Sequence, residues 1–185
     1  MIAYLGWGSL VWQPDGLPVR GQWLADGPTV CVEFLRQSGN GRLTLVMHAA
    51  ASAVTSFWVE AGTDDEGDAK RALREREAIP SKNMERHLGV WTHGCPAPAS
   101  IPGLADWAAA RGITTVLWTA LPPKFNGENQ RVPSVEEAVA YLASLSGQTA
   151  TLAEEYVRRA PPQIDTVYRR EFAARLGWHP LPKGS

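Results

Sequence analysis

The sequence predicts an α+β protein in which most strands precede most helices. Three observations support this fold class. Short β-branched and aromatic runs fill the first half of the 185 residues, a Gly-Asn-Gly turn joins two of these runs, and helix-type segments concentrate after residue 122. We therefore expect a single domain over 1–185. It should contain a core over 1–121 with an antiparallel or mixed sheet, and a helical tail over 122–185 that packs on this core.

The strands are predicted from runs rich in Val, Thr, Phe and Trp. In chain order we expect them over residues 2–6, 29–35, 42–49, 54–61, 89–92 and 113–121. The segment Ser38-Gly39-Asn40-Gly41 between the second and third runs predicts a hairpin, because Asn-Gly supplies the positive φ values of a tight turn. Hairpin connections favour an antiparallel or mixed sheet over repeated βαβ units.

The helices are predicted from caps and stop signals. In chain order we expect them over residues 64–79, 103–111, 134–145, 151–159 and 165–176. Three of them match a capping box: Thr63 with Glu66, Ser134 with Glu137, and Thr151 with Glu154. Pro80, Gly112 and Gly177 are the expected stops. Residues 81–94 allow a short helix before the strand at 89–92.

Composition excludes several classes of protein. A net charge of −1 without a basic block argues against a nucleic-acid partner. The chain has no run of about 18 apolar residues, so we expect no membrane span, and the apolar start lacks the basic flank of a signal peptide. With only Cys31 and Cys95, a disulfide framework is not expected and the reducing cytoplasm is the expected location.

The turn after the first strand, Gly6-Trp7-Gly8-Ser9-Leu10, is the first candidate site. Backbone N–H groups in such a turn can hold an anion or a developing oxyanion, and glycine is expected there for positive φ and for close approach of a ligand. An ordinary β-turn is the alternative. The segment matches neither a P-loop nor a dinucleotide-binding fingerprint, since no Gly-Lys-Ser or third glycine follows.

Glu77 is the second candidate. On the helix predicted over 64–79 it lies about 40° from Leu73, whereas Glu75 lies about 200° away. Glu77 should therefore face inward and Glu75 should face solvent. An inward carboxylate is suited to proton transfer. The alternative is an ion pair with Lys70, Arg74 or Arg76 on the same helix.

Together these two features resemble the γ-glutamylcyclotransferase family. Residues 4–12 are similar to its glutathione-degrading branch, in which the turn reads Gly-aromatic-Gly-Ser-Leu with a following Trp, and Arg76-Glu77 stands where the family carries its catalytic glutamate. The resemblance covers roughly residues 1–95 and implies a small mixed, largely antiparallel β-barrel flanked by helices. Residues 122–185 form a helical extension outside it.

The resemblance implies an intramolecular reaction without metal or organic cofactor. The α-amine of a γ-glutamyl substrate attacks its own γ-carbonyl, which gives 5-oxoproline and a free amine or peptide. Glu77 would carry the proton, and the turn formed by Gly6, Trp7, Gly8, Ser9 and Leu10 would bind the substrate. Trp7 replaces the usual Tyr, and Ala78-Ile79-Pro80 replaces Gly-Gly-Tyr, so the amine of the substrate stays open.

Other residues suggest weaker candidates. His87, His93 and Cys95 match no common zinc spacing, and Cys31 lies in an apolar strand without an evident His partner. Tyr156 and Tyr168 should pack, or one of them should reach a pocket. The eight Trp residues allow a second class of function, a non-catalytic module that binds a small ligand by stacking on Trp7 and Trp12.

Overall fold

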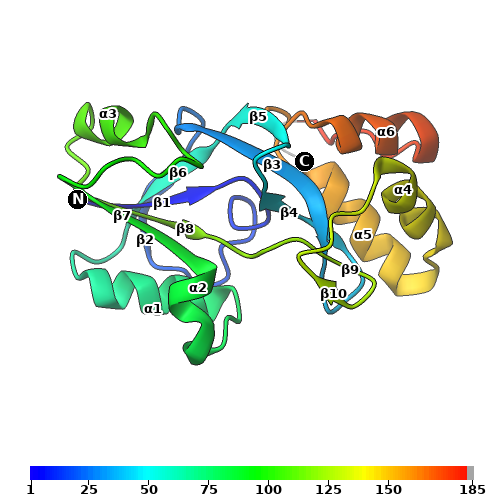
Figure 1. Cartoon of the computed structure of the whole chain (residues 1–185), viewed down its shortest axis with the longest axis horizontal. Helices are drawn as coiled ribbons and strands as arrows, with labels where there is room; N and C mark the ends of the chain where they lie inside the picture. Colours follow the sequence, from blue (N-terminus) through cyan, green and yellow to red (C-terminus); the bar gives the residue numbers. More distant parts are fainter. Residues whose placement is uncertain (183–185) are drawn as a thin grey trace. The chain divides into compact units, whose positions relative to one another are not determined.

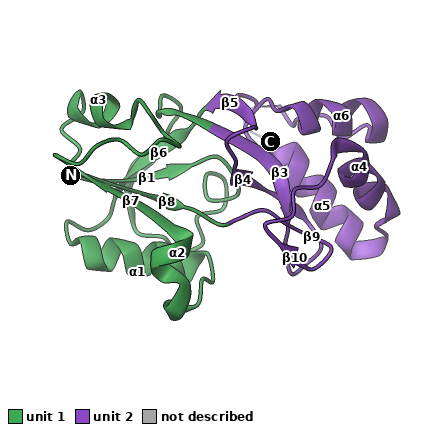
Figure 2. Cartoon of the chain, viewed as in Figure 1, with its two compact units in different colours: residues 1–30, 55–121 green, residues 31–54, 122–185 purple. Residues whose placement is uncertain are grey.

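The computed structural model describes residues 1–182 and shows an α+β protein, as predicted. Its elements form two compact units, one made of residues 1–30 and 55–121 and the other of residues 31–54 and 122–185 (Figures 1 and 2). Each unit has a mixed sheet, and no strand pairing among residues 1–182 closes either sheet into a barrel. Residues 31–54, which we expected in the core over 1–121, group with residues 122–185.

The first unit contains a five-stranded sheet in the order β2-β6-β1-β8-β7. Its strands are β1 (Ile2–Gly6), β2 (Val19–Leu24), β6 (Phe57–Ala61), β7 (Leu88–Thr92) and β8 (Thr115–Thr119). β1 lies at the centre, antiparallel to β6 and parallel to β8, and all of its residues are buried. This position explains its continuous apolar sequence. The edge strand β2 is mostly exposed and was not predicted, since its sequence lacks an apolar period.

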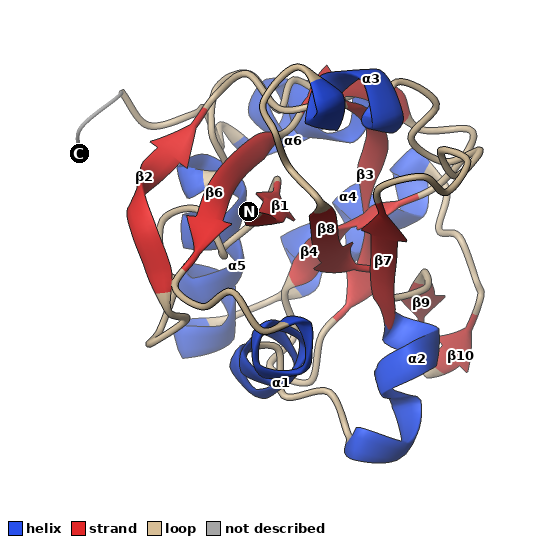
Figure 3. Cartoon of the chain, turned by 90° about the vertical axis from the view of Figure 1, so that its left-hand side faces the viewer, coloured by secondary structure: helices blue, strands red, loops and turns tan. Residues whose placement is uncertain are grey.

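Helices lie on both sides of this sheet, α1 (Glu66–Arg76) on one side and α3 (Leu104–Ala109) on the other (Figure 3). Two short helical turns, η1 (Ser81–Asn83) and α2 (Met84–His87), precede β7. The prediction for α1 is wrong at both ends. Asp65 is the N-cap, because its side chain accepts from the N–H of Asp68, and the helix stops at Arg76. The chain leaves the helix there because Ala78 adopts a left-handed conformation, with φ at 51°.

The second sheet has the order β10-β9-β3-β4, with β5 also paired to β3. Its strands are β3 (Thr29–Gln37), β4 (Leu43–Met47), β5 (Ser52–Thr55), β9 (Lys124–Phe125) and β10 (Glu128–Asn129). The predicted hairpin is confirmed as the antiparallel pair β3–β4. Of its Asn-Gly pair, only Gly41 has a positive φ, 82°. Asn40 acts through its side chain instead, since its Oδ1 accepts from Ser38 Oγ at 2.6 Å.

The strand predicted over 54–61 is divided into β5 and β6. Ser56 interrupts it because its side chain is fully buried and donates from Oγ to the carbonyl of Pro28 at 2.6 Å. Gly27 lies directly against this serine, and a Cβ there would come within 2.5 Å of Ser56 Oγ. This contact joins residues that are far apart in sequence, so the local pattern could not predict it.

Three helices complete the second unit: α4 (Val135–Ser144), α5 (Gly147–Arg159) and α6 (Val167–Leu176). The capping box of Ser134 with Glu137 is confirmed, and Gly177 ends α6 with φ at 74°. The capping box of Thr151 with Glu154 is wrong, because α5 begins at Gly147 and Thr151 lies inside it. Helices α5 and α6 pack on Phe34 of β3, whose ring meets Tyr156 and Phe172 edge to face.

Candidate functional site

The turn after β1 is held by its own backbone. The carbonyl of Gly8 accepts from the N–H of Val11 at 3.0 Å, and the carbonyl of Ser9 accepts from the N–H of Gln13 at 2.8 Å. Within residues 1–182, no protein acceptor takes a hydrogen bond from the N–H groups of Gly8, Ser9 or Leu10. The turn therefore contains three consecutive backbone donors without a backbone acceptor among the described residues, and Leu10 itself is buried.

Gly6 is required at this turn for a reason that differs from the expected one. Its φ is not positive, so conformational freedom does not select it. A Cβ at Gly6 would instead come within 2.9 Å of the ring of Trp23 and 3.1 Å of Val11. The expectation of positive φ at this glycine is wrong, and close side-chain packing explains the residue.

The end of α1 carries Glu77 as its C-cap. The N–H of Glu77 donates to the carbonyl of Leu73, and the N–H of Ile79 donates to the carbonyl of Arg74, both at 3.0 Å. Ile79 then inserts into the core of the first unit with Tyr4 and Leu73. Because this apolar residue anchors the chain two positions after Glu77, the glutamate is held in one place.

Arg76 joins Glu77 to the turn. Its Nη1 donates to Glu77 Oε1 at 2.7 Å, and its Nη2 donates to Ser9 Oγ at 3.3 Å and to the carbonyl of Gln13. The side chain is 8% exposed, and its buried Nε has no partner among the described residues. One guanidinium group thus connects the two segments that the sequence singled out.

The inward orientation of Glu77 is confirmed. Its side chain is 17% exposed, whereas that of Glu75 is 61% exposed. The alternative considered for Glu77, an ion pair on its own helix, is also present, with Arg76 as the partner. The inward orientation and the ion pair are thus both present in the same side chain.

The Trp residues at the turn offer little surface for stacking. Trp7 is 3% exposed, so its ring belongs to the core of the first unit, and Trp12 is half-buried. The ligand-binding alternative that used both rings therefore lacks a free face at Trp7.

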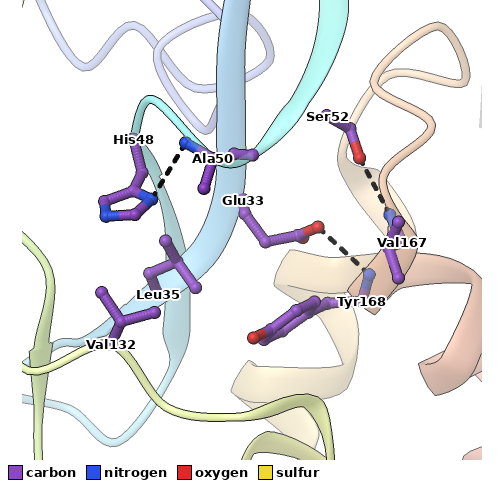
Figure 4. Close-up of a pocket in the computed structure, with 9 residues that line it drawn as sticks. Glu33, Leu35, His48, Ala50, Ser52, Val132, Val167 and Tyr168 are labelled. Atoms are coloured by element: carbon purple, nitrogen blue, oxygen red, sulfur yellow. Dashed lines mark hydrogen bonds between the residues drawn. The ribbon is translucent and has the colours of Figure 1, made fainter.

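A second group of polar side chains, which the sequence analysis missed, lies in the second unit. A pocket of about 250 Å³ is lined by Glu33, Leu35, His48, Ala50, Ala51, Ser52, Val132, Val167 and Tyr168 (Figure 4). Glu33 is only 3% exposed although it is charged. The sequence feature that indicates it is a single acidic residue inside the otherwise apolar run at 30–35.

Glu33 is held by neutral donors. Its Oε1 accepts from the N–H of Phe34 at 3.0 Å and from Thr166 Oγ1 at 2.5 Å, and its Oε2 accepts from the N–H of Tyr168 at 3.2 Å. Burial raises the pKa of this carboxyl group, and the hydrogen bonds only partly oppose the effect. Of the two tail tyrosines, Tyr168 reaches the pocket, while Tyr156 is buried against β4 and its hydroxyl accepts from the N–H of Leu45 at 3.3 Å.

Residues 1–182 contain no group of three or more His, Cys, Asp and Glu side chains placed to hold a metal ion. None of the helices in that range combines the length and apolar character needed to cross a membrane. Comparison of the chain with protein-family models and with curated proteins found no match.

Proposed function

We propose that this chain is a γ-glutamylcyclotransferase-like enzyme with its site at the turn after β1 and the end of α1. The observation that carries the proposal is the position of Arg76, which bonds both Glu77 and Ser9. The family resemblance rests on these same two segments. Their joining by one buried guanidinium group supports the assignment to a single site.

The reaction forms one bond and breaks one bond within the substrate. The α-nitrogen bonds to the γ-carbon, and the bond between the γ-carbon and the amine nitrogen breaks. Glu77 accepts a proton from the attacking nitrogen and donates it to the leaving amine, so the enzyme returns to its starting state. Because both reactants belong to one molecule, most of the acceleration would come from holding the folded conformer.

The free N–H groups of Gly8, Ser9 and Leu10 are suited to substrate oxygens that carry negative charge. Arg76 acts as a positioning residue, since it fixes the Glu77 carboxylate and ties the turn to the helix end. No step needs a metal or organic cofactor. The barrel implied by the resemblance and the cytoplasmic location are parts of this proposal.

The departures from the family pattern favour a γ-glutamyl amine other than glutathione. A tryptophan replaces the phenol of the turn, and Ile79 is buried in the core. Ala78, which stands where the family has glycine, keeps a left-handed backbone that suits glycine. The position of Glu77 at the helix end is therefore compatible with the replaced sequence, while the surroundings of the leaving amine differ.

The test is release of 5-oxoproline from a panel of γ-glutamyl amides and peptides, measured by mass spectrometry with wild type, Glu77→Gln and Glu75→Gln. We expect turnover of at least one panel member by the wild type, a loss of about 100-fold or more in Glu77→Gln, and no change in Glu75→Gln. Glu75 is a matched control because it lies on the same helix and faces solvent.

Two outcomes would contradict the proposal. One is a wild type that turns over no panel member at high enzyme concentration. The other is a folded Glu77→Gln variant with wild-type activity. Circular dichroism of each variant separates loss of chemistry from loss of fold.

A further inference from the structure

The pocket of the second unit combines a buried charge with apolar walls. Glu33 and Leu35 come from β3, His48 to Ser52 from the segment between β4 and β5, and Val167 and Tyr168 from the start of α6. Its volume of about 250 Å³ is below the range of about 300–1,000 Å³ typical of drug-sized ligands. The pocket therefore suits a small molecule.

Glu33 forms no ion pair within residues 1–182, although the charge of Arg170 interacts with it at longer range. Its hydrogen-bond partners are backbone N–H groups at Phe34 and at the start of α6, together with the hydroxyl of Thr166. A carboxylate in this state carries a desolvation cost that neutral hydrogen bonds offset only partly. The raised pKa of Glu33 has the same cause. A cation brought by a ligand would remove this cost.

The apolar part of the pocket is unusually exposed. Among the described residues, only four large apolar side chains are exposed, and two of them, Val132 at 41% and Val167 at 51%, line this pocket. The ring of Tyr168 adds an aromatic wall (Figure 4). Its hydroxyl is fixed by donation to the carbonyl of Pro133 at 2.7 Å. Apolar and aromatic walls around one charged group are typical of sites for organic ligands.

We propose that this pocket binds a small organic amine, with its ammonium group at the carboxylate of Glu33 and its apolar body against Val132, Val167 and Tyr168. The charged hydrogen bond selects the ammonium, and the aromatic ring adds a cation–π contribution. The residues that line the site lie at 33–52 and 132–168, all in the second unit, and the proposal does not depend on the proposed cyclotransferase activity.

The hydrogen bonds of Glu33 also hold the first turn of α6, so substitution of Glu33 alone would change fold and binding together. The decisive variant is therefore Val132→Trp, which fills the pocket from an exposed position. Val90→Trp is the matched control, because Val90 is 39% exposed and lies on β7 of the first unit. Glu33→Gln is a second variant that tests the charge.

The probes are benzylamine and its neutral analogue benzyl alcohol, measured by isothermal titration calorimetry and by shifts of backbone amide NMR signals. We expect benzylamine to bind wild type and Val90→Trp equally, with shifts at Glu33, Val167 and Tyr168. Benzyl alcohol should bind about tenfold or more weakly, and Val132→Trp and Glu33→Gln should each lose about tenfold or more in affinity for benzylamine.

Equal binding of benzylamine and benzyl alcohol would overturn the proposal, because charge would then not contribute. Full affinity in a folded Val132→Trp variant would overturn it as well, since the amine would bind elsewhere. Failure of benzylamine to bind at millimolar concentration would also reject an amine site of this size.

Discussion

Glu77 and Glu33 are both withdrawn from solvent, yet their surroundings differ in kind. Glu77, at the end of α1, faces the guanidinium group of Arg76 at 2.7 Å. Glu33, in β3, faces only neutral donors, from Phe34, Thr166 and Tyr168. The first carboxylate is therefore paired with a cation inside the protein, whereas the second has no ion pair and its burial raises its pKa. Two carboxylates that are both buried can therefore differ in their preferred protonation state, because one is bonded to a charged donor and the other to neutral donors.

The difference between the two carboxylates predicts that removing the cation beside Glu77 will have the largest effect on stability. Arg76→Met removes the cation that bonds to that carboxylate and to Ser9 and Gln13, so we expect a loss of about 3–5 kcal/mol in the free energy of unfolding. Urea denaturation measures it. Arg71→Met is the control and should cost less than about 1 kcal/mol, because the Arg71–Asp68 pair is exposed. Arg76→Met combined with Glu77→Gln should recover part of the loss, and no recovery would mean that the ion pair is not the cause.

Removing the charge of Glu33 should have a smaller effect that depends on pH. Since burial raises its pKa in the folded state, the folded protein binds the proton more tightly than the unfolded chain. Stability from this group is present at low pH and is lost as the pH rises from the unfolded pKa through the folded pKa.

A Glu33→Gln variant cannot titrate, so its stability does not fall through this group as the pH rises. Its amide NH₂, however, would face the N–H of Tyr168, and two donors cannot form a hydrogen bond. We expect a deficit of about 1–3 kcal/mol that is largest at low pH and shrinks as the pH rises. Urea denaturation at a series of pH values measures the difference, with Glu75→Gln as an exposed control. A deficit that grows with pH would show that the Glu33 carboxylate is favoured in its ionised form.

The hydroxyl groups of Thr166 and Ser9 test how strongly each site depends on a neutral hydrogen-bond partner. Thr166→Val removes a 2.5 Å hydrogen bond to Glu33 and the side-chain cap of α6, so we expect a cost of about 1–2 kcal/mol. Ser9→Ala removes a longer bond, 3.3 Å to Arg76, which keeps other partners, and should cost about 0.5 kcal/mol. Thermal unfolding of both variants measures the difference, and equal costs would argue against the stronger dependence of Glu33 on its neutral donors.

Another small effect, of opposite sign, is expected from the backbone that places Glu77. Ala78 has a φ of 51°, so Ala78→Gly should stabilise the protein by about 0.5–1 kcal/mol. Ala72→Gly inside α1 should instead destabilise it by about 1 kcal/mol. Chemical denaturation distinguishes the signs, and destabilisation in both variants would exclude strain at Ala78.

Elements with strong local signals were predictable from the sequence. β1, the β3–β4 hairpin and the capped helix α4 formed where they were expected, because an apolar run, a Gly turn and a capping box act over a few residues. Predictions failed where contacts with residues distant in sequence determine whether a strand forms or where it ends. Ser56 breaks a strand through contacts with Gly27 and Pro28, and β2 exists only because β6 pairs with it.

For the candidate site, the sequence by itself determined which residues lie at the turn and that Glu77 faces inward, because both depend on local pattern and helical period. Only the tertiary structure decided that Arg76 is the group between them, since its partners Ser9 and Gln13 lie more than 60 residues away. Glu33 shows the same limit. Its strand was predicted, but its burial among neutral donors depends on α6, which begins more than 130 residues later. Local pattern sets where an element forms and which way it faces, whereas the charge around a buried side chain depends on which distant segments pack against it.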